Sequence, residues 1–582
     1  MSNTNIDPTI LKRAQSWLSD VNIDDETKVR ISTLIENDPG ELAESFYCDL
    51  EFGTGGLRGI MGDGTNRMNR YTVGMATQGL ANYLKMVFAA EPEIRLAIAY
   101  DSRNKSSYFA RIAAEVLSAN GIVVYLFENL RPTPELSFAV RYLNCQSGIV
   151  ITASHNPKEY NGYKVYWNDG AQLVPPHDKN VIIEVQKIAS IGEVNFAGDE
   201  SKINMIGEKI DNEFLKISKS YSLAPEVIVP QKNMKIVYTP LHGTGITLVP
   251  QSLRNYGFEN IHIVEEQAVS DGNFPTIVSP NPEEKAAMQM ALDKARAIDA
   301  DLVLATDPDA DRIGVGVKDL DGNYILLNGN QTAALLTYYL IKQWQLKGKL
   351  TGNEYIVKTI VTSELLGDIA RSAGVEYFDC LTGFKWIAEV IRNLEGKKTF
   401  IGGGEESYGY MIGDFVRDKD AVTACCIFAE CAAWAGSKGK SLYELLLDIY
   451  LEYGLYKENL VNVVKKGMSG QAEIKAMMEG FRANPPKEIA GSQVTLMNDF
   501  QLRQATDVVT GNVTPIALPK SDVLQFFLAD GSKISMRPSG TEPKIKFYFS
   551  VRAELHAVAD FKKVEAKLDG RIEEIIVSMG LR

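Results

Sequence analysis

Three aspartates at alternate positions, Asp307, Asp309 and Asp311, directly follow the apolar run Asp301–Ala305. Carboxylates this close repel one another unless a cation compensates their charge. Oxygen ligands of this kind suit Mg²⁺. A calcium-binding EF-hand loop is excluded, because its sixth position would be Arg312 instead of glycine. The spacing therefore predicts a divalent metal site.

A serine stands on a second polar turn, Thr152–Pro157 (TASHNP), which follows the apolar residues 149–151. Ser154 offers a hydroxyl that could carry a transferable group, and His155 beside it could handle a proton. Adjacent residues do not by themselves form a Ser-His-Asp triad, and the turn lacks the G-x-S-x-G pattern of the α/β-hydrolases. Taken alone, this motif could also be an ordinary polar turn.

Four further segments could bind a polar or anionic ligand. Gly402–Ser407 (GGGEES) joins glycines to two carboxylates and a hydroxyl, a set suited to sugar hydroxyls. Arg537–Lys544 (RPSGTEPK) could form an anion-binding nest. Gly53–Gly59 carries Arg58, and Gly383–Lys385 carries Lys385, each in a predicted glycine-bearing loop. Gly53–Gly59 is not a Walker loop and does not fit the dinucleotide fingerprint. Each segment could instead be a structural turn.

Strands that alternate with helices must position these loops. Such an alternation predicts parallel βαβ units, in which ligands bind beyond the carboxyl ends of the strands. A helix is predicted over Tyr108–Asn120. The predicted strands of this part are Leu96–Tyr100, Ile122–Phe127, Ser147–Thr152, Lys235–Tyr238, Ile261–Val264, Asp301–Ala305, Tyr355–Lys358 and Thr399–Ile401.

The last block differs, because Val523–Leu528, Lys533–Met536 and Lys544–Val551 are typical of antiparallel strands and Val558–Met579 contains a helix. We therefore expect an α/β fold in which three α/β blocks precede a C-terminal α+β block. The polar stretch Gly192–Asn212 is predicted to separate the first two blocks. The expected domains are 1–210, 211–325, 326–455 and 456–582. Residues 1–45 are expected to pack as helices on the first domain.

Composition narrows the class of protein. A chain of 582 residues with 45% hydrophobic residues allows about four domains and excludes a wholly disordered chain. The net charge of −13 disfavours a dedicated nucleic-acid binder. Six cysteines without a Cys-x-x-Cys pair indicate reduced thiols. With no secretory signal and no membrane-spanning run, we expect a cytoplasmic protein with neither nucleic-acid nor membrane partners.

Taken in order along the chain, the four motifs TASHNP, DPDADR, GEES and RPSGTEPK resemble those of the α-D-phosphohexomutase superfamily, and most closely its long phosphoglucomutase branch. The resemblance runs from about Gly53 to Lys544. It implies four domains around a central cleft: three related α/β domains with mixed sheets and a C-terminal α+β domain. It also implies that Ser154 is the phosphorylated residue. The other residues implied to line the reaction centre are Arg58, His155, Lys164, Arg312 and Lys385.

The same resemblance implies the ligand sets. Asp307, Asp309 and Asp311 would hold Mg²⁺, together with an oxygen of the phosphorylated Ser154. Glu405 and Ser407 would bind sugar hydroxyls. The non-reacting phosphate would be bound by Arg537, Ser539, Gly540, Thr541 and Lys544. Lys164 would assist proton transfer, with a pKa lowered by burial and nearby cations, and His155 is a second candidate for this role.

The implied activity is an intramolecular phosphotransfer, classed as an isomerase, between α-D-glucose 1-phosphate and glucose 6-phosphate. Glucose 1,6-bisphosphate would be its intermediate or activator, and the enzyme would act as a monomer or a weak dimer. Glu406 and Tyr408 favour glucose over mannose within the resemblance. Phosphopentomutase or phosphomannomutase activity remains open, as do a haloacid-dehalogenase-type phosphatase with Asp307 as nucleophile and a regulator that only binds sugar phosphates.

Overall fold

The computed structural model describes residues 6–53, 56–465, 468–539 and 544–581. Within it the chain divides into two compact units. The first unit comprises Met1–Leu327, Ala388–Gly402 and Ser407–Gly439. The second unit comprises Asn328–Ile387, Gly403–Glu406 and Lys440–Arg582.

Three helices begin the first unit: α1 (Pro8–Ser19), α2 (Asp25–Asn37) and α3 (Pro39–Phe46). An aspartate caps the start of each, because its carboxylate accepts a hydrogen bond from an otherwise unpaired N–H of the first turn. The buried side chains Trp17 and Phe46 pack in one apolar cluster with Tyr71 and Ile191 of the following block. The predicted packing of these helices on the first block is therefore confirmed.

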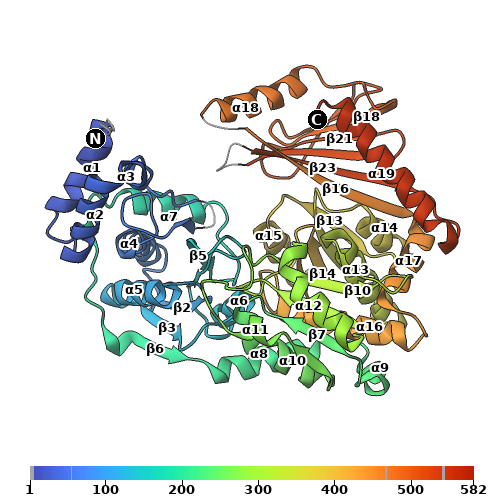
Figure 1. The fold of residues 1–582 in the computed structure, drawn as a ribbon, viewed down its shortest axis with the longest axis horizontal. Helices are drawn as coiled ribbons and strands as arrows, with labels where there is room; N and C mark the ends of the chain where they lie inside the picture. Colours follow the sequence, from blue (N-terminus) through green and yellow to red (C-terminus); the bar gives the residue numbers. More distant parts are fainter. Residues whose placement is uncertain (1–5, 54–55, 466–467, 540–543, 582) are drawn as a thin grey trace. The chain divides into compact units, whose positions relative to one another are not determined.

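The first sheet is mixed and has the strand order β1-β5-β4-β2-β3-β6. The pairs β4–β2, β2–β3 and β3–β6 are parallel, and β1–β5 and β5–β4 are antiparallel. Its strands are β1 (Gly56–Ile60), β2 (Arg95–Tyr100), β3 (Val123–Phe127), β4 (Ser147–Ile151), β5 (Tyr160–Trp167) and β6 (Ile203–Ile206). Its helices are α4 (Arg70–Val87), α5 (Ser106–Ala119), α6 (Thr133–Tyr142) and α7 (His177–Gln186) (Figure 1).

Two segments of this block contain strands that the sequence did not predict. The predicted glycine-rich loop around Arg58 is largely strand β1, an edge strand that pairs with β5. The polar stretch Gly192–Asn212 is not only a connection, because β6 within it extends the sheet beside β3. Strands β1 and β6 are both edge strands with exposed residues. They therefore lack the continuous apolar run that marks a buried strand.

The second sheet lies in the same unit and has the order β11-β10-β9-β7-β8. Strand β7 pairs in parallel with β8 and β9, whereas β9, β10 and β11 pair antiparallel. The segment 307–312, which carries the three predicted metal ligands, is the tight turn between β9 and β10. We call it the metal turn. Its strands are β7 (Ile236–Thr239), β8 (Ile261–Ile263), β9 (Leu302–Thr306), β10 (Ile313–Lys318) and β11 (Tyr324–Leu327). The helices of this part are α8 (Glu208–Ser220), α9 (Pro225–Ile228), α10 (Val249–Tyr256), α11 (Glu265–Ala268) and α12 (Lys285–Ile298).

The third sheet has the order β13-β12-β14-β15, with β12 and β13 parallel. Its strands are β12 (Glu354–Thr359), β13 (Glu376–Cys380), β14 (Thr399–Glu405) and β15 (Gly409–Ile412). The helices of this part are α13 (Gly329–Leu346), α14 (Leu365–Ser372), α15 (Phe384–Leu394), α16 (Ala421–Gly436) and α17 (Leu442–Tyr453). The three glycines of GGGEES lie within β14, so they are not the turn that their composition indicated.

The C-terminal sheet belongs to the second unit and has the path β16-β23-β22-β21-β18-β19-β20, with antiparallel pairs, as predicted. Helix α19 (Phe561–Ser578) lies along β16 and β23 (Figure 1). The other helix of this part is α18 (Met468–Ala483). The strands are β16 (Leu455–Val464), β17 (Glu488–Ile489), β18 (Ser492–Asp499), β19 (Gln504–Asp507), β20 (Val513–Pro515), β21 (Leu524–Leu528), β22 (Lys533–Pro538) and β23 (Lys544–Ala553).

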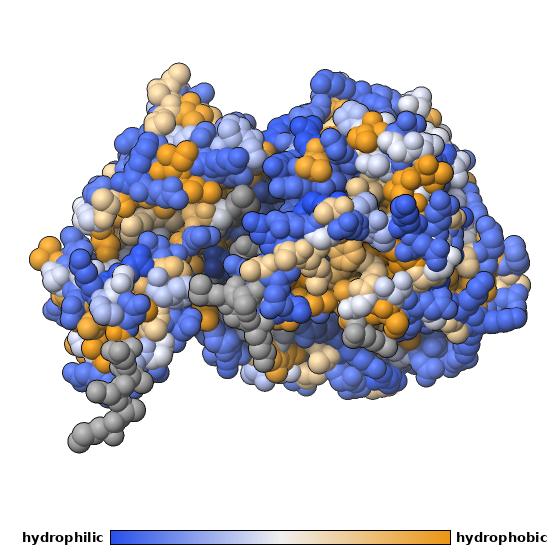
Figure 2. Space-filling model, turned by 90° about the horizontal axis from the view of Figure 1, so that it is seen from above, coloured by the Kyte–Doolittle hydropathy of each residue, from blue (hydrophilic) through white to orange (hydrophobic). Residues whose placement is uncertain are grey.

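On the face shown in Figure 2, hydrophilic residues predominate and the apolar ones lie in small scattered groups. Scattered apolar residues are normal for a protein surface and need no partner to explain them. Among the described residues, no helix combines the length and the apolar character needed to cross a membrane.

Candidate active site

The β9–β10 turn gathers the three predicted metal ligands. Asp307, Asp309 and Asp311 are all buried, and one carboxylate oxygen of each lies within 4.8 Å of the others. Asp307 Oδ1 accepts hydrogen bonds from the N–H groups of Asp311 at 3.1 Å and Arg312 at 3.0 Å, which folds the turn over its first carboxylate. Ala310 takes the left-handed conformation, with φ of 50°. The local sequence thus bends so that alternate side chains converge.

The loop after β7, which contains Gly243 and Thr244, supports this turn. Thr244 N–H donates to Pro308 O at 2.8 Å. Gly243 lies so close that a Cβ there would come within 2.4 Å of the Pro308 Cα. This loop therefore packs directly on the metal turn, and a larger residue at position 243 would displace it.

The donor set fits a divalent cation. Asp309 Oδ1 and Asp311 Oδ1 are buried and accept no hydrogen bond, so each leaves a carboxylate oxygen available inside the cluster. Burial, together with the nearby Asp309 and Asp311, raises the pKa of Asp307 well above its ordinary value. A cation bound here would offset the repulsion between the carboxylates and would favour their ionised forms. The described residues contain no other group of three potential metal ligands.

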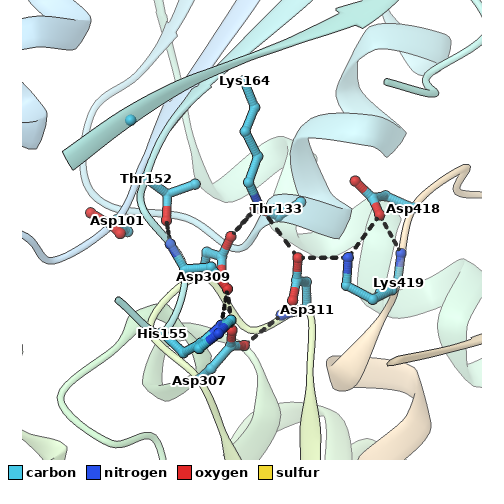
Figure 3. Close-up of polar contacts among 12 residues, drawn as sticks. Asp101, Thr133, Thr152, His155, Lys164, Asp307, Asp309, Asp311, Asp418 and Lys419 are labelled. Carbon is cyan, nitrogen blue, oxygen red and sulfur yellow. Dashed lines mark hydrogen bonds and ion pairs between the residues drawn. The ribbon is translucent and has the colours of Figure 1, made fainter. Parts of the chain in front are cut away.

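Lys164 reaches this cluster from β5 (Figure 3). Its Nζ lies 2.7 Å from Asp309 Oδ2 and 3.4 Å from Asp311 Oδ2. Burial alone would lower the pKa of Lys164, but the two carboxylates outweigh it and the pKa is raised. The expectation of a lowered lysine pKa is therefore wrong for this arrangement, because its neighbours are mainly anions. Burial alone would raise the pKa of Asp309, yet the Lys164 ammonium holds it below the ordinary value.

Ser154 meets the metal turn from the end of β4. Its Oγ donates to Asp307 Oδ2 at 2.8 Å and lies 3.1 Å from His155 Nδ1. The residue is buried, and its φ of 53° is in the left-handed region that non-glycine residues rarely adopt. Thr152 Oγ1 accepts the Ser154 N–H at 2.8 Å and helps hold this conformation. Such backbone strain is often found at functional sites.

Arg103 holds the serine turn together, a role that no motif in the sequence predicted. Its guanidinium donates to Ser154 O at 2.5 Å and to Pro157 O at 2.8 Å. It also donates to Asn156 O and, at 3.0 Å, to Tyr160 O. Because these four carbonyls surround one planar fork of donors, the turn can adopt few other shapes. Only the folded turn shows this role, since a lone arginine 51 residues earlier carries no local signal.

His155 sits among positive charges. Burial, together with Arg312 and Arg58, lowers the pKa of His155 well below its ordinary value. The imidazole is therefore neutral near pH 7. A neutral ring can accept a proton in principle, but its lowered pKa makes it a weak base.

Asp418 and Lys419, which no motif in the sequence indicated, lie on the other side of the metal turn. Lys419 Nζ is 3.0 Å from Asp311 Oδ2 and 3.3 Å from Asp418 Oδ1. Asp418 Oδ2 in turn accepts hydrogen bonds from Tyr166 OH at 2.6 Å and Gln172 Nε2 at 2.8 Å. The ion pairs of Lys419 continue to Lys164 through Asp311, as Figure 3 shows. The available signal for these contacts in the sequence was the pair of charged residues, Asp418 and Lys419, just before helix α16.

Helix α6 provides one further contact. Thr133, its first residue, donates its side-chain hydroxyl to Asp309 Oδ2 at 3.1 Å and its N–H to Asp309 O at 2.9 Å. The amino end of a helix also favours negative charge. Asp309 is thus oriented by a helix of the first block, which no spacing in the sequence indicated.

The remaining predicted residues of the first unit are Arg58, Arg312 and Ser407. Arg58 projects from β1, and its Nη1 lies 3.5 Å from Asn156 Oδ1, at the limit of a hydrogen bond. Arg312 forms an ion pair with Glu283. Ser407 follows β14 at the turn to β15.

The second unit carries the other predicted residues. Lys385 lies in the first turn of α15, so the prediction of a loop position is wrong. Glu405 ends β14 and is buried. Arg537 is near the end of β22, and its Nη1 donates to Tyr548 OH at 3.4 Å. Ser539 N–H donates to Lys544 O at 2.8 Å across the β22–β23 connection. Gly540 and Thr541 lie outside the described residues.

Comparisons with known proteins agree with this arrangement. Sequence profiles named phosphoglucomutase/phosphomannomutase, alpha/beta/alpha domains I, II and III match residues 49–191, 217–322 and 328–453. A phosphoglucomutase of Staphylococcus haemolyticus is 38% identical over 519 residues, which cover 88% of this chain and 92% of the relative. One from Staphylococcus aureus (strain USA300) is 39% identical over 543 residues, covering 91% and 94%.

Solved structures share the fold. A phosphoglucomutase of Paramecium, described as pp63/parafusin in its open form, matches with a TM-score of 0.65 at 17% identity, over 91% of this chain and 96% of that one. A phosphoglucomutase/phosphomannomutase family protein of Burkholderia thailandensis matches with a TM-score of 0.63 at 18% identity, over 90% and 97%. Matched by three family profiles in order, and by relatives along most of its length, the chain belongs to the phosphoglucomutase/phosphomannomutase family of the α-D-phosphohexomutase superfamily.

Proposed function

We propose that the chain is a phosphoglucomutase that interconverts α-D-glucose 1-phosphate and glucose 6-phosphate through a phosphorylated Ser154. The observation that carries this proposal is the hydrogen bond from Ser154 Oγ to Asp307 inside a buried cluster of three carboxylates. The curated relatives named phosphoglucomutase, at 38–39% identity over about nine tenths of the chain, support the same substrate.

The reaction consists of two phosphoryl transfers, one from Ser154 to the sugar and one from the sugar back to Ser154. In the first, the bond between phosphorus and Ser154 Oγ breaks while a bond forms between phosphorus and O6 of glucose 1-phosphate. The O6 proton leaves to a base, and Ser154 Oγ takes up a proton. Glucose 1,6-bisphosphate results. The bisphosphate then turns end over end, and its O1 phosphoryl group passes to Ser154 Oγ, which gives up its proton, while O1 recovers one. Glucose 6-phosphate leaves and the phosphoserine is restored.

The chain's own residues position and compensate charge, which is the main requirement of phosphoryl transfer. Asp307, Asp309 and Asp311 would hold Mg²⁺, which when bound supplies positive charge beside the transferring group. Arg103 and Thr152 keep the Ser154 turn in one shape. Because Ser154 starts in this strained, fixed geometry, little reorganisation is needed when the phosphoryl group arrives.

Proton transfer has two candidate groups in this proposal. Lys164 contacts Asp309 and Asp311 and is held as an ammonium, so it can donate a proton to a leaving oxygen. His155 lies beside Ser154 Oγ as a neutral imidazole, so it can accept one. Lys164→Met and His155→Gln variants separate them, because the group that transfers the proton sets the pH dependence of kcat.

Substrate binding falls to the remaining predicted residues. In this proposal Glu405 and Ser407 bind the sugar hydroxyls. Arg537 and its neighbours Ser539, Gly540, Thr541 and Lys544 bind the phosphate that does not react. Arg58, Arg312 and Lys385 add positive charge near the transferring group.

A turnover assay with three sugar phosphates tests the proposal. Glucose 1-phosphate, mannose 1-phosphate and ribose 1-phosphate are compared with Mg²⁺ and a trace of glucose 1,6-bisphosphate. We expect the largest kcat/KM for glucose 1-phosphate, and no turnover by a Ser154→Ala variant. A larger value for mannose or ribose would make the enzyme a phosphomannomutase or phosphopentomutase. Full mutase activity of the Ser154→Ala variant would overturn the proposal.

The same assay distinguishes a mutase from a phosphatase and from a binding protein. A haloacid-dehalogenase-type phosphatase would release inorganic phosphate, whereas a mutase conserves it. The family profile over 217–322, which includes the Asp307 turn, favours the mutase. A regulator that only binds sugar phosphates would show binding without turnover.

A further inference from the structure

The loop between β12 and α14, Thr359–Glu364, makes contacts in two directions within the second unit. We call it the 359–364 loop. Thr359 and Thr362 are completely buried, and Ile360 and Val361 nearly so. Lys358 Nζ, just before it, pairs with Glu364 Oε1 at 3.1 Å and with Asp379 Oδ1 at 2.7 Å, which ties both ends of the loop to the sheet.

In one direction the loop holds Glu406, the second carboxylate of GGGEES. Glu406 Oε2 accepts from Thr359 Oγ1 at 3.0 Å and from Thr362 Oγ1 at 3.2 Å. The two hydroxyls lie 2.8 Å apart, so all three groups form one polar cluster. Glu406 directly follows Glu405. A fixed Glu406 side chain therefore fixes the end of the strand that carries the proposed sugar ligand.

In the other direction the loop is held by Lys533 of β22. Lys533 is buried, and its Nζ donates to Ile360 O at 3.1 Å, Thr362 O at 3.1 Å and Glu364 Oε1 at 2.6 Å. All three protons of the ammonium thus go to one loop. A buried cation with three well-placed acceptors is a rigid attachment, because any displacement would leave a buried charge unpaired.

The same face of β22 carries the proposed phosphate ligand. Because side chains alternate along a strand, Lys533, Ser535 and Arg537 point to one face. Gln525 Nε2 of the adjacent strand donates both to Ser535 Oγ at 2.8 Å and to Ile360 O at 2.7 Å. Tyr548, whose hydroxyl meets Arg537, packs in one apolar cluster with Ile360 and Val361. The loop therefore lies against the very face that presents Arg537.

We propose that the 359–364 loop couples the two ends of the substrate site, so that Glu406 is a positioning residue and not a sugar ligand. Through the loop, Glu406 sets where Glu405 stands relative to Arg537. This inference rests on the proposed function, in which Glu405 binds the sugar and Arg537 the distant phosphate. Two binding groups held at a fixed separation bind a rigid ligand better than two that move independently.

The first test asks whether Glu406 acts through its hydrogen bonds. Glu406→Gln keeps an acceptor oxygen for both threonine hydroxyls, whereas Glu406→Ala removes it. We expect Glu406→Gln to keep kcat/KM for glucose 1-phosphate within about three-fold of wild type. Glu406→Ala should raise KM at least ten-fold. Equal losses in both variants would instead indicate that the negative charge itself contacts the substrate, and would overturn the positioning role.

The second test measures the coupling as a double-mutant cycle. All proteins carry Ser154→Ala, so that binding of glucose 6-phosphate is measured by calorimetry without turnover. The loop variant is Thr359→Val with Thr362→Val, which keeps the shape and removes both hydroxyls. The second change is Arg537→Ala. If the loop aligns Arg537 with the sugar site, the combined loss of affinity is at least three-fold smaller than the product of the separate losses.

Thr495→Val is the matched control, because Thr495 Oγ1 donates to Phe527 O at 3.1 Å within the C-terminal sheet and not to the loop. When Thr495→Val is combined with Arg537→Ala, the loss of affinity for glucose 6-phosphate should equal the product of the two separate losses. A multiplicative result for the loop variant as well would overturn the coupling. If the double valine variant does not fold, Glu406→Ala takes its place in the cycle with the same criterion.

The outcome also separates this inference from the proposed function. A wild-type enzyme that binds glucose 6-phosphate but does not turn over glucose 1-phosphate would contradict the proposed function, yet the binding cycle would still measure the coupling. No binding of glucose 6-phosphate by the folded Ser154→Ala protein would overturn both. Turnover together with a multiplicative loop cycle would overturn the coupling alone.

Discussion

The Ser154 hydroxyl and the Asp307 carboxylate are 153 residues apart in sequence and 2.8 Å apart in space. Each sits on a turn that forces a non-glycine residue into the left-handed region, Ser154 in one case and Ala310 in the other. Side chains from further segments complete the cluster: Lys164 from β5, Thr133 from α6 and Lys419 from the residues before α16. The proposed chemistry thus depends on single atoms that come from separate strands, helices and loops.

At this scale the metal site gives the first prediction. Asp309→Ala removes one ligand and leaves the Lys164 ammonium without its nearest partner. We expect Mg²⁺-dependent turnover to fall at least 1,000-fold, since the charge that compensates the transferring group is lost (about 4 kcal/mol of transition-state stabilisation). Mg²⁺ affinity, measured by calorimetry, should fall in parallel. Asp293→Ala, an exposed acid on α12, is the control, and an unchanged Mg²⁺ affinity in Asp309→Ala would contradict the assignment.

Arg103 gives the second prediction. Arg103→Lys keeps the charge, but a single ammonium cannot reach the carbonyls of Ser154, Asn156, Pro157 and Tyr160 together. A shift of the serine turn by about 1 Å should lower kcat roughly 100-fold with a smaller change in KM. Arg111→Lys, at a half-exposed ion pair on α5, is the matched control. If Arg103→Lys kept wild-type kcat, the turn would not need this clamp.

At the scale of elements, the sequence predicts those strands that are buried on both faces. The predicted Leu96–Tyr100 and Val523–Leu528 agree with β2 and β21 to within one residue at each end. Apolar runs bounded by turn residues carry that signal. Edge strands β1 and β6 lack it, and so were missed. The glycines of β14 were misread as a turn because glycine gives the same signal in a turn and in a strand approached closely by other backbone.

The same limit applies to the site. The four motif loops could be recognised because each holds its chemistry within a few residues. Arg103, Thr133 and Lys419 could not, because their partners lie on other elements and only the fold brings them together. Nor could the sequence give the sign of the shift in the Lys164 pKa, which depends on whether anions or cations surround the amine.

Helix α16 provides the third prediction, at its amino end. Asp420 caps the helix by accepting the Thr423 N–H at 3.0 Å, and burial raises the pKa of Asp420 to about 6. A carboxyl whose pKa is raised in the folded state stabilises most below its unfolded pKa, and this contribution is lost as the pH rises through 6. Between pH 5 and pH 8 the loss is about 1.4 kcal/mol.

An Asp420→Asn variant keeps an acceptor for the cap but cannot titrate. Its melting temperature relative to wild type should therefore rise between pH 5 and pH 8, by about 2 °C. Asp24→Asn, at the cap of α2, is the control, because hydrogen bonds from Tyr71 and Thr27 hold the pKa of Asp24 below its ordinary value despite burial. A melting-temperature difference that stays constant for Asp420→Asn would contradict the raised pKa.

At the scale of the whole molecule, all six cysteines are free thiols. Five of them are buried, and burial raises the pKa of Cys145 to about 12. Only Cys48 is partly exposed. Because the thiolate is the reactive form, a thiol reagent should modify one cysteine rapidly in the native enzyme and all six after unfolding. Rapid native modification of three or more would contradict the packing around α16, where Cys425, Cys426 and Cys431 lie.

The three family profiles cover 49–191, 217–322 and 328–453, and each lies inside one of the first three expected domains. The boundaries 1–210, 211–325, 326–455 and 456–582 stay predictions. The division of the chain into two compact units, with residues 388–402 and 407–439 in the first, shows why such boundaries are hard to read from sequence. Segments of the third block belong to the same compact unit as the metal turn.

The most direct measurement locates the phosphoryl group on the enzyme. The protein is incubated with Mg²⁺ and glucose 1,6-bisphosphate labelled with ³²P, denatured in acid, digested and sequenced by mass spectrometry. The account predicts one acid-stable phosphate on Ser154 that is removed by excess unlabelled glucose 1-phosphate. A phosphate on Asp307 that hydroxylamine releases, as it does any acyl phosphate, or an acid-stable one on any residue other than Ser154, would contradict it.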